Sequence, residues 1–281
     1  MMSQERLFVS EKSGKPKGVY RRILEHLFLS RYSEGATEIP FASRDIRAAA
    51  DEIEVDQPAN PPDVLYSMRY RGNTPEAISE MEPEGKSWII RGTGTGSYSF
   101  ALIDKLDIVP NPLMGETKIP DATPGIVAMY ASGDEQALLV NLRYNRLIDI
   151  FTGITCYSLQ NHLRTAVSGV GQVETDEIYV GVARRGTHYV LPVQAKGGTD
   201  RQNVVQIEQD FALCADRFPG LICKAIAAQF MADDLIALFE FEQNEGVVAL
   251  VREKHYRLVP PEEISEEDLS RYRQQPLNGE G

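Results

Sequence analysis

Residues 171–198, GQVETDEIYVGVARRGTHYVLPVQAKGG, decide the fold of the chain. Two runs rich in β-branched and aromatic residues flank the turn sequence Ala-Arg-Arg-Gly at 183–186. This pattern predicts a β-hairpin. Acidic residues gather where the first strand begins, and Gln194 and Lys196 end the second strand before a Gly-Gly break at 197–198. Hairpin pairing therefore brings the polar ends of the two strands together.

The pairing of this hairpin has two possible registers. A three-residue loop at 184–186 places Asp176 opposite Gln194, whereas a two-residue loop places Glu177 opposite Gln194. A slip of one residue moves every side chain to the other face of the sheet, so the sequence leaves both registers open. In either case the opposed side chains have Cβ atoms roughly 4.5–5.5 Å apart, close enough to share one ion.

An acid on one strand and an acid-x-Lys sequence on the next resembles the PD-(D/E)xK nuclease superfamily, and within it the type II restriction endonucleases. Asp176 or Glu177 matches the first acid of that motif. Gln194 takes the position of the second acid, and Lys196 that of the lysine. The spacing of Glu174 and Asp176 is similar to a Glu-x-Asp pair that many of these nucleases use, which favours Asp176. Gln194 departs from the pattern, because most members have Glu or Asp there.

The resemblance implies a Mg²⁺-dependent phosphodiester hydrolase whose catalytic residues are Asp176, Gln194 and Lys196. Asp176, Glu174 and the amide oxygen of Gln194 would be the metal ligands. Lys196 would orient or deprotonate the attacking water and offset charge that develops on the phosphate. A glutamine oxygen is able to ligate Mg²⁺ but has no negative charge, so metal affinity should be lower unless Glu174 or a water compensates.

The first hundred residues show three helical patterns followed by a hairpin with a glycine-rich tip. This order resembles a winged helix-turn-helix that covers roughly residues 15–104. The third helix would then be the recognition helix, with Arg69 and Arg71 near its exposed end as DNA-binding residues, because guanidinium groups bind guanine edges and phosphates bidentately. The expected helices are 19–32, 43–53 and 63–69, and the expected strands are 88–91 and 97–103, joined by Gly-Thr-Gly-Thr-Gly at 92–96.

The rest of the chain reads as an α/β domain. We expect a proline-rich connector, then a helix within 151–167 that leads into the hairpin and offers Gln160 to the site. An amphipathic helix at 202–218 follows the hairpin, and its residue Gln206 faces the site. Further strands are expected at 221–230, 235–241 and 246–252, and a frayed acidic tail at the end. The predicted fold class is α/β: a winged-helix domain at 1–104 and a restriction-endonuclease-like mixed sheet flanked by helices at 105–281.

Composition sets broad limits on these expectations. The chain of 281 residues is long enough for one large or two ordinary domains. Its net charge of −12 argues against a surface coated with basic residues for nonspecific nucleic-acid binding. The three cysteines form no CxxC motif, and the sequence shows neither a signal peptide nor an apolar run of about 18 residues. A cytoplasmic protein without a zinc site or a membrane span is expected.

Together these patterns predict a site-specific endonuclease of the type II restriction type that cleaves double-stranded DNA with Mg²⁺. The resemblance to restriction enzymes implies a homodimer, since a two-fold protein matches a palindromic DNA site. One alternative is a repair or recombination nuclease of the same fold that recognises DNA structure. Another is a catalytically inactive winged-helix DNA-binding regulator, for which Gln194 is the motivating feature.

Overall fold

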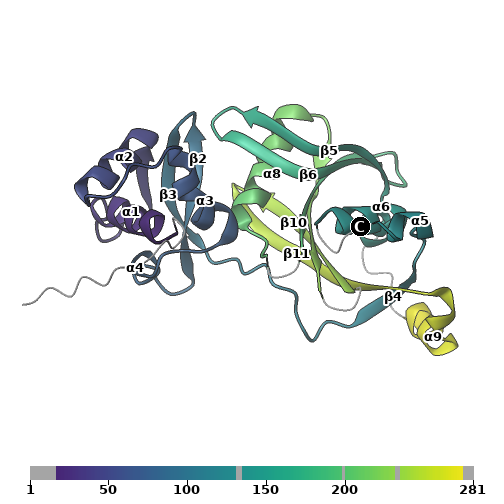
Figure 1. The fold of residues 1–281 in the computed structure, drawn as a ribbon. Helices are drawn as coiled ribbons and strands as arrows, with labels where there is room; N and C mark the ends of the chain where they lie inside the picture. The colour runs from purple at the N-terminus through teal and green to yellow at the C-terminus, as the bar shows by residue number, and fades with distance from the viewer. Residues whose placement is uncertain (1–16, 131–134, 198–199, 232–234, 275–281) are drawn as a thin grey trace, which may run out of the picture.

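The structure is a computed structural model that describes residues 17–130, 135–197, 200–231 and 235–274. It is a mixed α/β protein, in which N-terminal helices with a three-stranded antiparallel sheet precede an eight-stranded mixed sheet with its own helices (Figure 1). Residues 1–16 of the expected N-terminal domain, Gly198 and the last residues of the expected tail lie outside the described part of the chain.

The N-terminal unit, residues 17–104, consists of short helices packed on the three-stranded sheet. Its core is aromatic: the Phe28 ring lies edge-on to Trp88 and Phe100, with centroids 5.1 and 5.2 Å away. The three expected helices and the glycine-tipped hairpin are confirmed, and a further strand joins them to give the order β1-β3-β2. The elements are α1 (Lys17–Leu29), β1 (Glu38–Ala42), α2 (Ser43–Glu52), α3 (Pro61–Arg71), α4 (Glu76–Ser79), β2 (Lys86–Gly94) and β3 (Ser97–Asp104).

The eight-stranded sheet follows the order β4-β11-β10-β9-β7-β6-β5, and β8 pairs with β7 outside this path. β7 is parallel to β8 and β9, and β4 is parallel to β11, whereas the other neighbours are antiparallel. The strands are β4 (Glu116–Pro120), β5 (Thr155–Val167), β6 (Gly171–Val182), β7 (His188–Lys196), β8 (Ile222–Cys223), β9 (Ala225–Phe230), β10 (Leu235–Asn244) and β11 (Val247–Val259).

Helices cover both faces of the large sheet. Along β7, Leu191 and Val193 pack with α6 and α7, whereas Val190 packs against α8 on the opposite face. Figure 1 shows α6 in the hollow of the curved sheet. The expected amphipathic helix after the hairpin is confirmed as α8. The helices are α5 (Gly125–Ala128), α6 (Glu135–Tyr144), α7 (Leu147–Thr152), α8 (Val204–Arg217), the 3₁₀ turn η1 (Pro261–Glu263) and α9 (Glu266–Gln274).

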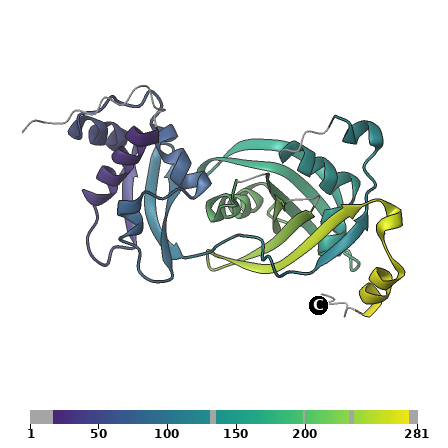
Figure 2. The same ribbon diagram turned by 60° about the horizontal axis from the view of Figure 1, so that its bottom comes forward.

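The N-terminal unit docks on α8 through a shared apolar cluster (Figure 2). Ile89 of β2 and Ala101 of β3 lie in the same buried cluster as Val205 and Phe211 of α8. At the edge of this contact, the Arg91 guanidinium donates two hydrogen bonds of 2.9 and 2.5 Å to the Glu208 carboxylate. The contact therefore combines buried apolar area with a bidentate ion pair, which fixes the unit against the large sheet.

The expected helix within 151–167 is wrong for most of its length. Residues 155–167 form β5, the edge strand of the large sheet, and the helix α7 ends before Gly153, which has a φ of 71°. The helical reading failed because β5 is exposed at most of its positions. A strand with so few buried residues lacks the apolar alternation by which strands are recognised.

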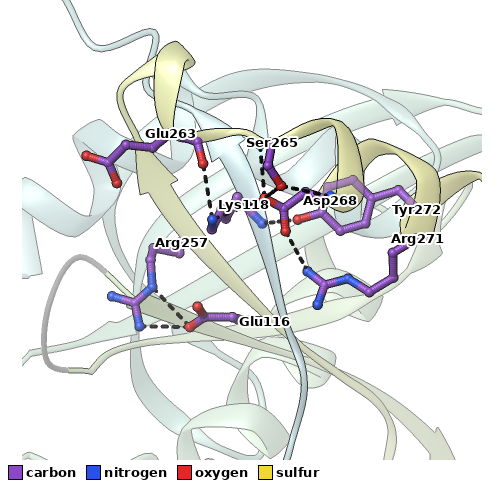
Figure 3. A network of polar contacts seen from close by, with 8 residues as sticks. All are labelled: Glu116, Lys118, Arg257, Glu263, Ser265, Asp268, Arg271 and Tyr272. Atoms are coloured by element: carbon purple, nitrogen blue, oxygen red, sulfur yellow. Dashed lines mark hydrogen bonds and ion pairs between the residues drawn. The ribbon is translucent and has the colours of Figure 1, made fainter.

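The expected frayed tail is also corrected, because residues 266–274 form α9 (Figure 3). Lys118 of β4 connects the helix to the sheet: its ammonium group donates to Asp268 at 3.1 Å and to the Glu263 carbonyl at 3.1 Å. Hydrogen bonds from Ser265, together with this ammonium group, lower the pKa of Asp268 to about 2. The Lys118 backbone N–H donates to the Tyr272 hydroxyl at 2.9 Å. Across the described ranges, no helix is long and apolar enough to cross a membrane.

Candidate functional site

The central hairpin adopts the register of the three-residue loop. Ala183 N–H donates to the Thr187 carbonyl at 2.9 Å, and Glu177 pairs with Val193 at the far end of the ladder. The same register, continued by one residue, sets Asp176 beside Gln194. A hydrogen bond of 2.7 Å from Ala195 N–H to Asp176 Oδ2 holds the two strand ends together at that point.

Asp176 and Lys196 meet at the open end of this hairpin. Burial raises the pKa of Asp176, against the opposing effects of the Ala195 N–H and the Lys196 charge. The Lys196 side chain is only 14% exposed, and its ammonium group lies 3.2 Å from Glu135 Oε1 on α6. A half-buried carboxylate and a partly buried lysine beside it are the kind of pair that binds and activates a polar substrate.

Gln194 is fully buried, and its amide is bonded within the protein. Its Nε2 donates to both Asp210 oxygens at 3.1 and 3.0 Å and to the Glu174 carbonyl at 3.1 Å. Its Oε1 accepts from Gln206 Nε2 at 3.2 Å. The side chain therefore points toward α8, where its oxygen already accepts one hydrogen bond.

The two adjacent acids of β6 have different surroundings. Glu177 is fully buried and accepts hydrogen bonds from Arg143 at 2.9 and 3.1 Å and from Ser158 at 2.5 Å. It therefore links α6 to β5 and β6. Glu174, two residues before Asp176 on the same strand, is exposed. Of the two candidates for the first acid, Asp176 is the one that faces open space.

A cleft of about 910 Å³ lies between the N-terminal unit and the open end of the hairpin. One wall is formed by α3 and the turn between β2 and β3, and it includes Arg69 and Arg71. The other wall includes Glu174, Asp176 and Lys196. The cleft thus brings these candidate residues together from positions more than a hundred residues apart, and Gln206 of α8 also lines it. Gln194 lies behind this wall.

Glu135 and Asp210 belong to this site and were missed in the sequence. Asp210 lies on the apolar stripe of α8 between Ile207 and Phe211. A carboxylate in such a stripe is the sequence signal by which it could have been found. Burial, and secondarily the charge of Asp176, raise its pKa well above the ordinary value. Gln160 was the expected additional residue, but it lies exposed on β5. Helix α6, earlier in the chain, supplies Glu135 instead.

The donor atoms fit a hydrated Mg²⁺ better than a fully caged ion. Among the described residues, no three His, Cys, Asp or Glu side chains come together as a metal cluster. Asp176 Oδ2 is bonded to Ala195, and no donor in the described part of the chain meets its Oδ1. Mg²⁺ is commonly held by one or two carboxylates, with waters and phosphate oxygens as its other ligands. Asp176 and the nearby Glu174 meet that requirement.

Comparisons of the chain with protein families, with curated proteins and with solved structures found no match.

Proposed function

We propose that the chain is a Mg²⁺-dependent DNA endonuclease of the PD-(D/E)xK type. The observation that supports this most is the shared cleft: Asp176 and Lys196, the acid and the lysine of the motif, open into the same cavity as Arg69 and Arg71. A carboxylate for a metal, a lysine for a water and arginines for phosphates are the groups that phosphodiester hydrolysis requires.

The proposed mechanism assigns a role to each polar residue of the cleft wall. Bound Mg²⁺ would polarise the scissile phosphate and lower the pKa of its water. Asp176 and Glu174 would hold the ion through their carboxylate oxygens. Lys196 orients the attacking water or removes its proton, and its charge offsets the negative charge that develops on the phosphate. The Glu135 carboxylate positions the Lys196 ammonium group at 3.2 Å.

The N-terminal unit is proposed to act as a winged helix, with α3 as the recognition helix and the β2–β3 turn as the wing. The arrangement of α1, α2, α3 and the hairpin β2–β3 supports this reading. Because α3 lines the cleft, its arginines would contact DNA close to the cut. A homodimer acting on a palindromic duplex, as in the type II restriction enzymes, is part of the same proposal.

An inactive winged-helix DNA-binding regulator is the second candidate. The observation that favours it is Gln194, whose amide replaces a carboxylate and is hydrogen-bonded to Asp210, Gln206 and the Glu174 carbonyl. A site with one fewer carboxylate binds Mg²⁺ more weakly. Such a protein would bind DNA through the same cleft and leave it intact.

Plasmid cleavage with Mg²⁺ separates the two candidates. The wild-type protein should cut, and Lys196→Ala should lower the rate by roughly 10²–10⁴, the effect of losing a positioned acid–base group. Lys254→Ala, at an exposed lysine of β11, is the matched control and should cut at the wild-type rate. Discrete fragments indicate site-specific restriction, and a smear indicates cleavage that depends on the structure of the DNA and not on its sequence.

Two results would refute the nuclease mechanism. One is a wild-type protein that shifts DNA in a gel with Mg²⁺ but never cuts it, which supports the regulator. The other is a Lys196→Ala variant that cuts at the full rate. Binding in Ca²⁺ should be retained by Lys196→Ala, because one of several phosphate contacts is lost.

A further inference from the structure

The wall of the cleft that α3 forms carries neighbouring tyrosine rings and guanidinium groups, and Tyr98 of β3 lies next to them. Arg71 lies 5.5 Å from the Tyr66 ring centroid, and the Tyr66 and Tyr70 rings are 5.5 Å apart. Arg69 lies 5.0 Å from the Tyr70 ring and 5.7 Å from the Tyr98 ring. Aromatic faces interleaved with arginines are the surface on which single-stranded nucleic acids stack their bases.

Arg69 supplies an independent observation, because it is a buried cation and two of its nitrogen atoms lack a hydrogen-bond acceptor among the described residues. The residue is only 8% exposed, and its Nε and Nη2 atoms have no hydrogen-bond partner among the described residues. A buried polar group without a partner is costly, and a buried charge more so. A phosphate oxygen in the cleft is the acceptor that suits a guanidinium group best.

The cleft offers partners for both the bases and the phosphates of an unpaired strand. Its walls carry further cations, Arg164 and Arg201, among acidic side chains such as Glu174 and Asp176. Unpaired bases are free to stack on aromatic rings, whereas the bases of a paired duplex are stacked on one another.

We infer that this cleft binds an unpaired stretch of one DNA strand, with a base stacked on Tyr66 and a phosphate at Arg69. A palindromic duplex would meet this requirement only where a nucleotide is flipped out of its stack, so DNA that contains a bubble or a flap should bind more tightly. The Tyr66 residue is 51% exposed, so a base is able to pack against the open part of its ring beside Arg71. The inference rests on the proposed function only in assuming that the bound strand is cut. The binding itself is measured under conditions without cutting.

Fluorescence anisotropy in Ca²⁺ tests the inference with three labelled DNAs of one sequence: a paired duplex, the same duplex with a short bubble, and a single strand. The wild-type protein should bind the bubble and the single strand more tightly than the paired duplex. Tyr66→Ala should weaken binding to both unpaired DNAs by roughly 5- to 150-fold, the range for one lost base stack. Its affinity for the paired duplex should not change.

Two control variants make this result specific. Tyr66→Phe keeps the ring and should keep the preference, and Tyr144→Ala removes an exposed tyrosine of α6 outside the cleft and should change nothing. Equal wild-type affinity for the three DNAs would overturn the inference. So would a Tyr66→Ala variant that retains the preference or that loses affinity for all three DNAs equally.

The two proposals fail in different ways. A protein that prefers the bubble but cuts no DNA in Mg²⁺ contradicts the nuclease and upholds the binding inference. A protein that cuts paired DNA and binds the three DNAs equally contradicts the inference and upholds the nuclease.

Discussion

Asp176 and Glu177 are neighbours in the sequence, yet they have different environments. Glu177 is fully buried and forms an ion pair with Arg143, whereas Asp176 lines the cleft beside Lys196. Because burial raises the pKa of Asp176, its proton would compete with the proposed metal ion to a higher pH than at an ordinary aspartate. The contacts around each acid thus decide which of the two opens into the cleft.

Substitution of the two acids should separate catalysis from stability. Asp176→Asn should lower the cleavage rate by at least roughly 10²-fold, since loss of an outer-shell group alone costs up to that much. Glu177→Gln should leave the rate per folded molecule near that of the wild type. It should instead lower the free energy of unfolding by about 1–3 kcal/mol, because Arg143 and Ser158 lose a charged acceptor. Plasmid cleavage and urea unfolding of both variants measure the two effects.

The opposite ranking of these variants would show that Glu177, despite its burial, is the functional acid. In that case the hairpin would have to use the other register during catalysis.

At the scale of elements, α8 is attached to the hairpin through a buried polar contact. Asp210 on the helix and Gln194 on β7 are both buried and bonded to each other. Burial raises the pKa of Asp210 well above its ordinary value. The folded protein therefore favours the protonated form more than the unfolded chain does. This contribution to stability is complete below the ordinary carboxyl pKa and is lost as pH rises through the raised one.

Asp210→Asn should remove this pH dependence. As pH rises from the ordinary value of 3.8 toward the raised folded pKa, the wild-type protein should lose stability relative to the variant. Outside that window the difference between the two should be constant. Thermal unfolding across pH measures it, with Asp216→Asn, at an exposed position of the same helix, as the control. Parallel curves for Asp210→Asn and the wild type would show that Asp210 is not titrating in this window.

The elements differ in how far the sequence could predict them. The hairpin was predictable from its β-branched strands and turn sequence, and α8 from the apolar stripe on one of its faces. The register was not, since both loops suit Ala-Arg-Arg-Gly, and the closing bond between Ala183 and Thr187 decides it. β5 was wrongly predicted as a helix because most of its side chains are exposed, so its sequence lacks the alternation of apolar and polar residues that is typical of a strand. The candidate acids could be identified in the sequence. The orientation of Gln194 toward α8 could not, because it depends on hydrogen bonds to Asp210 and Gln206 that form only in the folded protein.

At the scale of the whole molecule, the N-terminal unit and the large sheet share a hydrophobic cluster. Ile89 and Ala101 lie with Val205 and Phe211 in that cluster. Gly92 allows a still closer approach, because a Cβ added there would lie 2.1 Å from the Val170 carbonyl oxygen. Removal of residues 1–104 would expose the apolar side of α8. Such a truncation is therefore a poor test of DNA binding by the N-terminal unit.

Because of this shared cluster, calorimetry should show a single unfolding transition with equal calorimetric and van't Hoff enthalpies. Ile89→Ala should lower the stability of the whole protein by about 2–5 kcal/mol, the usual cost of a buried isoleucine. Val109→Ala, at an exposed valine, should change it by less than about 0.5 kcal/mol. Two separate transitions in the wild-type protein would show that the two parts unfold independently.

The position of β4 determines when the large sheet is completed during synthesis. Residues 116–120 pair in parallel with residues 255–259, and Lys118 holds the still later helix α9. A ribosome makes the N-terminal partner of this pair long before the C-terminal one. β4 therefore has no neighbouring strand until nearly the whole chain has emerged. The N-terminal unit, whose three strands all lie before residue 105, has all of its own strands much sooner.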